Sequence, residues 1–164
     1  MDKIIVIGPG GAGKSEMSRK LRENLNLPLY HLDNIFWKED RTHITREEFD
    51  KKLKELLAKD KWIIDGDYSR TYEVRIEKAD TVIFLDYPLD ICLSGIESRI
   101  GKPRDDIPWK EDRFDPDFNE WIINWFKETR PKVLQRIDKY KDKKNIVVLH
   151  SREEGKEFIN KIAK

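Results

Sequence analysis

The sequence has very little of what marks a secreted or membrane-bound protein. Cys92 is the only cysteine among 164 residues, so no disulfide can form within the chain. No apolar run approaches the roughly 18 residues that a membrane-spanning helix needs, and the first such run is typical of a strand rather than a signal peptide. We therefore expect a cytoplasmic protein without a membrane partner, in which Cys92 packs in the core.

The sequence also lacks an excess of charge of either sign. Its 33 lysines and arginines balance 32 aspartates and glutamates, which leaves a net charge of +1. A protein that binds nucleic acid through phosphate contacts is expected to carry a clear basic excess. The Asn-Lys-x-Asp and Asp-x-x-Gly motifs of GTPase switches are absent as well. We expect a small-molecule partner, no direct contact with nucleic acid, and a monomer or dimer.

A glycine-rich motif lies close to the N-terminus. Residues 8–15 read Gly-Pro-Gly-Gly-Ala-Gly-Lys-Ser, between an apolar run at 3–7 and a helical pattern at 14–25. A strand, a loop and a helix in that order let backbone N–H groups converge on a triphosphate. Lys14 would pair with the β- and γ-phosphates, and the Ser15 hydroxyl would hold Mg²⁺. The motif predicts ATP and Mg²⁺ as cofactors, bound by Gly8, Pro9, Gly10, Gly11, Ala12, Gly13, Lys14 and Ser15.

Apolar runs and helical patterns alternate along the rest of the chain, which predicts an α/β fold with a parallel sheet covered by helices on both faces. Thr45 with Glu48 is typical of a capped helix start, and Ser151 can cap the last helix. Trp121, Trp125 and Phe126 keep a helical spacing that favours the core. Strands are expected at 3–7, 28–32, 61–65, 81–85 and 145–149, and helices at 14–25, 45–59, from 88 onward, 118–141 and up to 163.

Three aspartates follow predicted strands, at the edge where ligands of parallel sheets collect. Asp65 is the leading candidate to organise the metal and Asp86 competes with it, because carboxylate oxygens suit Mg²⁺. Either could instead cap a turn, a role that suits Asp86 before Pro88. Asp33 could orient or deprotonate an acceptor hydroxyl, or it could cap the turn that begins at Asn34. These alternatives stay open at the level of the sequence.

The segment 101–116 differs from its surroundings. It holds three of the seven prolines, alternating charges and no helical period, so we expect a lid. Arg99 and Arg104 at its near end would bring positive charge onto the transferring phosphate as catalytic residues. Arg113 and Arg130 are further candidates, and Arg70 could hold an anionic group of the acceptor. Each of these arginines could equally be a solvated surface charge.

Aromatic side chains lie near the polar strand ends. Phe36, Trp37 and Tyr68 could stack on an acceptor base or ring, or they could pack in the core. His31 falls within the strand at 28–32, which favours a packed side chain over a participant in the reaction. The residues expected to bind the acceptor are Asp33, Phe36, Trp37, Asp65, Gly66, Tyr68 and Arg70.

Five segments of the chain together match the pattern of a known family. They are the motif at 8–15, Leu-Pro-Leu-Tyr-His-Leu-Asp-Asn-Ile-Phe-Trp at 27–37, Trp-Ile-Ile-Asp-Gly-Asp-Tyr-Ser-Arg-Thr at 62–71, Ala-Asp-Thr-Val-Ile-Phe-Leu-Asp-Tyr-Pro at 79–88 and Leu-His-Ser-Arg at 149–152. In these segments the chain resembles the topology-modulation (FlaR-type) proteins, which are adenylate-kinase-like P-loop kinases. The resemblance covers nearly the whole chain.

This resemblance implies a three-layer P-loop NTPase fold with a five-stranded parallel sheet of order 2-3-1-4-5. Within a single kinase domain over residues 1–164, it implies an acceptor-side helical segment at about 34–60 and a lid at about 99–117. Asp65 and Gly66 resemble the pair that ends a core strand in nucleoside monophosphate kinases, and Arg70 resembles their acceptor-binding arginine. Where the family has Asn, this chain has Asp67, which adds negative charge near the phosphates.

We therefore expect an ATP- and Mg²⁺-dependent phosphotransferase of adenylate-kinase type, which transfers the γ-phosphate to a nucleotide, nucleoside or similar small acceptor. A kinase of a small hydroxylated metabolite, with Asp33 as its base, is an alternative. A nucleotide-binding regulatory protein with an indirect effect on DNA topology is another, although nothing in the quoted residues explains such an effect.

Overall fold

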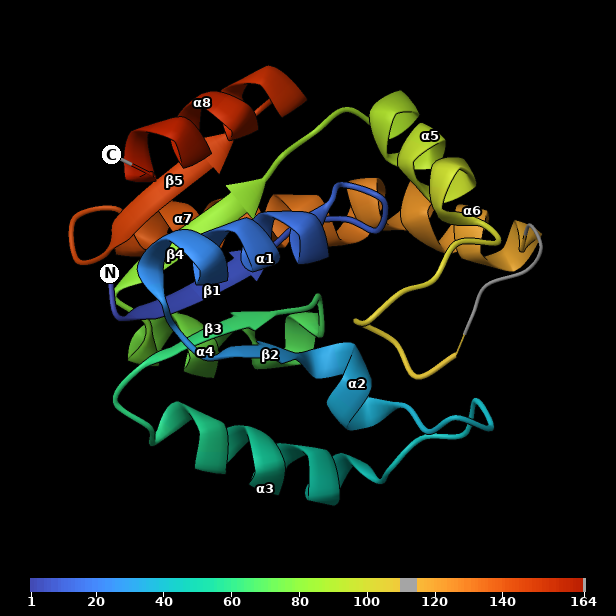
Figure 1. Ribbon diagram of the computed structural model, residues 1–164, viewed down its shortest axis with the longest axis horizontal. Helices are drawn as coiled ribbons and strands as arrows, with labels where there is room; N and C mark the ends of the chain where they lie inside the picture. The colour runs from blue at the N-terminus through green and yellow to red at the C-terminus, as the bar shows by residue number, and fades with distance from the viewer. Residues whose placement is uncertain (110–114, 164) are drawn as a thin grey trace.

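A five-stranded parallel sheet forms the centre of the molecule (Figure 1). The computed structural model describes residues 1–109 and 115–163 of the chain. The strands lie in the order β2-β3-β1-β4-β5, as predicted, and each neighbouring pair is parallel. Parallel neighbours cannot be joined by tight turns, so the chain crosses between them through helices. The strands are β1 (Lys3–Ile7), β2 (Leu29–His31), β3 (Trp62–Asp65), β4 (Thr81–Leu85) and β5 (Asn145–Leu149).

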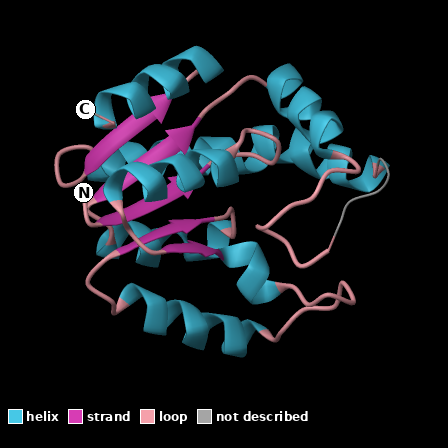
Figure 2. Cartoon of the chain, viewed as in Figure 1, coloured by secondary structure: helices cyan, strands magenta, loops and turns pink. Residues whose placement is uncertain are grey.

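Helices cover both faces of the sheet (Figure 2). Ile4 and Val6 of β1 pack toward α1 and α8, whereas Ile5 and Ile7 pack toward α3, α4 and α7. Successive strand residues point to opposite faces, so a strand buried on both sides is apolar throughout. This is why the strands appear in the sequence as continuous apolar runs. The covering helices are α1 (Lys14–Leu25), α3 (Arg46–Leu57), α4 (Tyr72–Lys78), α7 (Arg130–Tyr140) and α8 (Arg152–Ile162).

The carboxyl ends of the strands point toward a group of shorter elements (Figure 1). The short helix α2 (Leu32–Phe36) and the 3₁₀ turn η1 (Ser69–Thr71) were not expected from the sequence, and neither was α4. The strand expected at 28–32 ends at His31, because Leu32 turns into the core as the first residue of α2. Asp33 therefore lies in a helical turn rather than after a strand. Helix α5 (Leu89–Arg99) completes this group.

The helical stretch predicted at 118–141 is divided in three. Helix α6 (Pro116–Asn124) runs into a π-helical turn, η2 (Trp125–Thr129), which leads into α7. Pro131 falls in the first turn of α7, where its missing N–H costs least. Trp125 is buried as expected, but Trp121 is 47% exposed, so its assignment to the core was wrong. Trp121 lies in α6, one turn before Trp125, and lines a cleft instead of packing in the core.

Two predicted helix caps are confirmed. The Thr45 hydroxyl accepts a hydrogen bond of 3.1 Å from the backbone N–H of Glu48, and the Ser151 hydroxyl accepts one of 3.1 Å from that of Glu154. Such caps satisfy N–H groups that have no partner within the helix and are worth about 1 kcal/mol each. They fix where α3 and α8 begin.

The Asp80 carboxylate joins the start of β1 to β4. Its Oδ2 accepts the backbone N–H groups of Asp2 and Lys3, each at 2.9 Å, and its Oδ1 accepts the Thr81 hydroxyl at 2.7 Å. Burial acts to raise the pKa of Asp80, but these donors outweigh it and hold the pKa below its ordinary value. The stabilisation is therefore present at neutral pH and is lost as the pH falls through that lowered pKa.

We expect Asp80→Ala to lower the free energy of unfolding by about 1 kcal/mol at neutral pH, because three donors lose their acceptor. The difference from the wild type should narrow as the pH falls below about 4 and passes through the lowered pKa of the wild-type carboxylate. Urea unfolding at several pH values measures this. Asp60→Ala, which removes an exposed carboxylate, is the control and should change little. A difference that stays constant over this range would contradict the assignment.

Candidate active site

The phosphate-binding motif forms the loop between β1 and α1, as its sequence predicts. Gly11 adopts a φ of 79°, a left-handed conformation that favours glycine. A Cβ atom at Gly11 would lie 2.0 Å from the backbone oxygen of Cys92 in α5, so a larger residue cannot fit. The loop is therefore held tightly between the sheet and α5, and the first turn of α1 begins at Lys14.

The Lys14 ammonium folds back over its own loop. It donates hydrogen bonds to the backbone oxygens of Gly8 and Pro9, at 3.0 and 2.9 Å. Burial lowers the pKa of Lys14, and the negative charges of Asp67, Asp33 and Asp65 act in the opposite direction. The lysine is thus close to three carboxylates that follow β2 and β3.

An open cleft of about 1640 Å³ lies at the carboxyl ends of the strands. Its walls come from the motif and α1, from α2 and the loop after β3, and from α5, residues 102–109 and α6. Gly8, Pro9 and Ala12 of the motif do not line it, because they form the inner side of the loop. The predicted residues that do line it are Gly10, Gly11, Gly13, Lys14, Ser15, Asp33, Trp37, Asp65, Gly66, Tyr68, Arg99 and Arg104.

Asp33 and Tyr68 form a pair on one wall of this cleft. The Tyr68 hydroxyl donates a hydrogen bond of 2.7 Å to Asp33 Oδ1. Burial raises the pKa of Asp33, although the Tyr68 hydroxyl and the Lys14 charge oppose the shift. Burial and the Asp33 charge raise the pKa of Tyr68 far above its usual value, so its hydroxyl stays protonated as the donor. The pair offers a carboxylate oxygen and a hydroxyl to a ligand in the cleft.

The three aromatic residues predicted at the acceptor site lie together, with the Phe36 ring centre 5.0 Å from that of Trp37 and 5.3 Å from that of Tyr68, but they do not all line the cleft. Trp37 and Tyr68 line the cleft. Phe36 instead stacks on His43, with ring centres 4.6 Å apart, and packs edge-on against Phe49. Its side chain belongs to an aromatic layer beneath the cleft and does not line it.

Asp65 ends β3 and is almost fully buried. The Nδ1 atom of His31 lies 2.8 and 3.0 Å from its two carboxylate oxygens. Burial lowers the pKa of His31, but the hydrogen bond and the charge of Asp65 outweigh it and raise the pKa above its ordinary value. His31 therefore orients Asp65, a polar role that its place within a strand did not suggest. Asp86, the competing metal candidate, does not line the cleft and accepts two hydrogen bonds from Arg130, at 2.8 and 2.9 Å.

A fully buried arginine, Arg75, holds the loop that follows β3. It donates to the Thr71 hydroxyl at 2.9 Å, to the backbone oxygen of Gly66 at 3.0 Å, and to those of Asp67 and Tyr68. Arg75 was not predicted as a functional residue. The sequence offers one sign of this role, which is that Arg75 falls on the apolar side of a helix, four residues after Thr71. Arg75 fixes the backbone that presents Asp65 and Tyr68 to the cleft.

The predicted arginines occupy different surroundings. Arg70 is exposed and pairs with Asp50 of α3 through two hydrogen bonds, at 2.7 and 3.1 Å. It lies outside the cleft, away from any acceptor bound there. Arg99 lines the cleft with its guanidinium 5.4 Å from the centre of the Phe118 ring. Arg113 lies outside the described residues.

Residues 101–109 lie across the phosphate-binding loop without helix or strand, and α6 begins at Pro116. Residues 110–114 of the expected lid lie outside the described part of the chain. Asp106, which the sequence analysis did not single out, accepts a hydrogen bond of 2.6 Å from the Ser15 hydroxyl. Arg104 donates two hydrogen bonds to Asp106, at 3.0 and 2.7 Å. Asp105 pairs with Arg19 of α1 at 2.6 Å.

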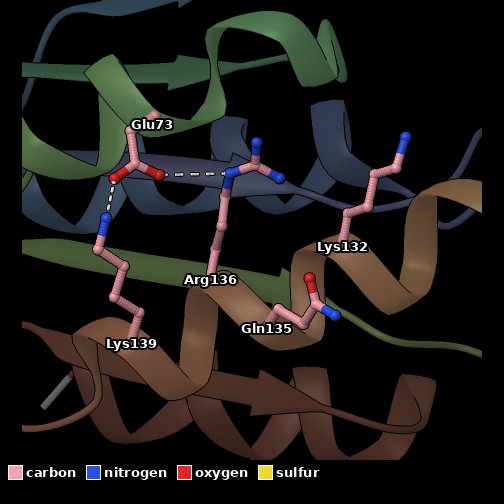
Figure 3. A pocket seen from close by; sticks show the side chains of 5 residues that line it. All are labelled: Glu73, Lys132, Gln135, Arg136 and Lys139. Atoms are coloured by element: carbon pink, nitrogen blue, oxygen red, sulfur yellow. Dashed lines mark hydrogen bonds and ion pairs between the residues drawn. The ribbon is translucent and has the colours of Figure 1, made fainter.

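A second, smaller hollow of about 300 Å³ lies between α4 and α7 (Figure 3). Glu73 points between Lys139 and Arg136, with N–O distances of 2.5 and 3.4 Å. Lys132 and Gln135 complete its walls. Surface ion pairs of this kind contribute little to stability, and no residue of the phosphate-binding loop lines this hollow. The predicted phosphate-binding residues line the larger cleft.

Solved structures of other proteins share this fold. No protein-family model matches the chain, and no curated protein matches its sequence. A shikimate kinase from Bacteroides thetaiotaomicron matches with a TM-score of 0.61 and 17% identity, over 97% of this chain and 94% of that one. A gluconokinase from Sinorhizobium meliloti 1021 matches with a TM-score of 0.60 and 15% identity, over 99% and 89%.

The chain has the fold of the P-loop kinases. A deoxyadenosine kinase from M. mycoides also shares it, with a TM-score of 0.52 and 15% identity, over 97% of this chain and 98% of that one. At these identities the likeness concerns the fold, so membership of the topology-modulation family stays a prediction. Among the described residues, no helix is both long and apolar enough to cross a membrane.

Proposed function

We propose that this protein is an ATP- and Mg²⁺-dependent small-molecule kinase of adenylate-kinase type. The observation that carries the proposal is that Lys14 and Ser15 of the phosphate-binding loop share one cleft with Asp33. Phosphoryl transfer needs a nucleotide held at the phosphates and an acceptor oxygen placed in line with the γ-phosphate. The loop would hold the nucleotide, and where the acceptor oxygen belongs to a hydroxyl, Asp33 would accept its proton.

The nucleotide side of the cleft has donors for phosphate and oxygen ligands for a hard cation. The backbone N–H groups at the start of α1 and the Lys14 ammonium would bind the β- and γ-phosphates. The Ser15 hydroxyl and the Asp65 carboxylate have the oxygen chemistry that Mg²⁺ prefers, and they would hold it directly or through water. When bound, Mg²⁺ would neutralise phosphate charge as the γ-phosphoryl group moves.

The acceptor side is aromatic, which favours a nucleotide or nucleoside. Trp37 lines the cleft with its ring edge-on to Trp109, at 5.6 Å, and Tyr68 lies beside Asp33. Flat aromatic walls bind a base by stacking. The guanidinium of Arg41 lies 5.6 Å from the Trp109 ring and also lines the cleft, which suits an acceptor with an anionic group.

A kinase of a small hydroxylated metabolite is the second candidate. The Asp33–Tyr68 pair can bind hydroxyls of an acceptor that has no ring to stack on Trp37.

We propose one kinase domain with an acceptor side at about 34–60, a small-molecule acceptor, and no direct nucleic-acid contact. A monomer and a dimer both fit this proposal.

The segment 101–109 would act as a lid over the bound nucleotide. Closure excludes the water that would otherwise accept the phosphoryl group, and it would place Arg104 and Arg99 near the phosphates. We expect amide hydrogen exchange in residues 101–109 to slow when Mg–ATP and an acceptor analogue bind together, as measured by mass spectrometry. Arg104→Lys should lower kcat, because the point charge of a lysine cannot replace the two parallel hydrogen bonds that Arg104 donates to Asp106. Exchange that is slow without nucleotide and unchanged by it would make the segment a fixed loop.

The proposed function is tested by ADP release. Wild-type protein is incubated with Mg–ATP and a panel of nucleoside monophosphates, nucleosides and hydroxylated metabolites, with Lys14→Ala as the control. We expect acceptor-dependent ADP release with one class of acceptor and none from the control. Tight ATP binding with no release across the panel would contradict the kinase and favour a nucleotide-binding regulatory protein.

A further inference from the structure

The hydroxyl that the motif assigns to the metal already has a carboxylate beside it. Ser15 Oγ lies 2.6 Å from Asp106 Oδ2, although Asp106 follows 91 residues later in the chain. The contact joins the first turn of α1 to the segment 101–109. It brings to the phosphate-binding loop a carboxylate that does not come from the sheet.

Asp106 is held in a fixed orientation. Arg104 donates from Nε to one of its oxygens and from Nη2 to the other, and both side chains are largely buried. The guanidinium of Arg104 thus keeps the carboxylate of Asp106 in place, with one oxygen against the Ser15 hydroxyl.

Ser15 Oγ and Asp106 Oδ2 are two oxygen ligands whose chemistry and spacing suit a small divalent cation. Mg²⁺ binds hard oxygens at about 2.0–2.1 Å in an octahedron, so two neighbouring ligands lie about 2.9 Å apart. The two oxygens of this pair are 2.6 Å apart. Asp65 and Asp106 each have both carboxylate oxygens in contact with a neighbour, Asp65 with His31 and Asp106 with Arg104. It is Asp106 whose oxygen lies within hydrogen-bond distance of the Ser15 hydroxyl, which places this carboxylate beside the serine ligand position.

We propose that Asp106 is a ligand, together with Ser15, of the divalent cation that accompanies the nucleotide. This inference rests on the proposed function and adds a metal ligand from the lid. The Ser15 hydroxyl turns its hydrogen away and a lone pair toward the cation, and Asp106 exchanges the Ser15 hydrogen bond for the cation. Arg104 keeps the carboxylate oriented from its other side.

A competing explanation predicts effects of the opposite sign. A carboxylate at the N-terminus of α1 could occupy the place of a phosphate and repel ATP. Its removal would then strengthen ATP binding whether or not Mg²⁺ is present. A metal ligand, by contrast, matters only when the metal is there. The dependence of nucleotide affinity on Mg²⁺ separates the two.

The test is isothermal titration calorimetry with ATP, in Mg²⁺ and in EDTA, on the wild type, Asp106→Asn and Asp138→Asn. Asp138 carries the same charge and pairs with Lys141 at the surface, outside the cleft, which makes it the control. We expect Asp106→Asn to weaken Mg–ATP binding by about 10- to 100-fold and to leave metal-free ATP binding unchanged or stronger. Asp138→Asn should shift neither affinity by more than about twofold.

A change of metal preference gives a second readout that a purely structural role would not produce. In Asp106→Cys the ligand becomes a soft sulfur, so Mg²⁺ should support nucleotide binding poorly and Cd²⁺ should restore it. Equal strengthening of ATP binding with and without Mg²⁺ in Asp106→Asn would overturn the inference, as would no Cd²⁺ rescue. A wild-type protein that binds no ATP would overturn the proposed function itself.

Discussion

Lys14→Ala is expected to remove phosphoryl transfer and leave the fold intact. The ammonium acts on charge that develops on the transferring phosphoryl group, and such contacts are worth about 3–4 kcal/mol in the transition state. This corresponds to a loss in kcat of roughly a hundred- to a thousandfold. In the free protein the ammonium donates hydrogen bonds to the carbonyls of Gly8 and Pro9, which solvent in the cleft can replace.

Steady-state ADP release and thermal unfolding measure the two parts of this prediction. Lys20→Ala is the matched control, because Lys20 lies on the same helix and its ammonium pairs with exposed Glu16 at 3.1 Å. It should keep its activity within about twofold. Wild-type turnover in Lys14→Ala would show that the loop is not the catalytic site.

Asp33→Asn is expected to lower kcat by about a hundred- to ten-thousandfold, the range that a positioned general base contributes. The asparagine keeps the shape and can still accept the Tyr68 hydrogen bond, but it cannot take a proton. Burial raises the pKa of Asp33, which makes the carboxylate a better base than an exposed aspartate. Because Asp33 faces the acceptor, the affinity for Mg–ATP should change little.

Transfer rates and calorimetric ATP affinity together test the role of Asp33. Tyr68→Phe, which removes the donor and keeps the carboxylate, should lower kcat by a smaller factor than Asp33→Asn. An Asp33→Asn variant with wild-type kcat would assign the residue to structure. A variant that loses ATP binding and transfer in parallel would place Asp33 on the nucleotide rather than on the acceptor.

The parts of the fold that local patterns encode could be predicted from the sequence. Central parallel strands need apolar residues on both faces, so β1, β3 and β4 stand out as short apolar runs, and the half-buried edge strand β5 keeps such a run as well. The motif at 8–15 sets several glycines and Lys14 at a fixed spacing, which identifies the loop that precedes α1. The capping pattern at Thr45 likewise placed the start of α3. Each of these signals lies within a few residues of the chain.

The parts of the site that depend on distant contacts could not be predicted in the same way. Asp106 meets Ser15 only because the segment 101–109 returns across the loop, and no local pattern encodes that return. Arg70 is an arginine after a core strand, yet its neighbour on α3 is Asp50, which draws it to the surface. Trp121 has the spacing of a core residue but is exposed and lines the cleft.

The central claim is that the cleft transfers the γ-phosphate of ATP to a small acceptor. It is tested most directly by ³¹P nuclear magnetic resonance on the wild-type protein with Mg–ATP and the acceptor found in the panel. The account predicts that the γ-phosphate resonance disappears while ADP and a single phosphorylated product grow in equal amounts, and that neither forms with Lys14→Ala. The product is a phosphate ester where the acceptor is a hydroxyl and a phosphoanhydride where it is a nucleoside monophosphate. ATP that stays bound and intact, or inorganic phosphate as the sole product, would contradict it.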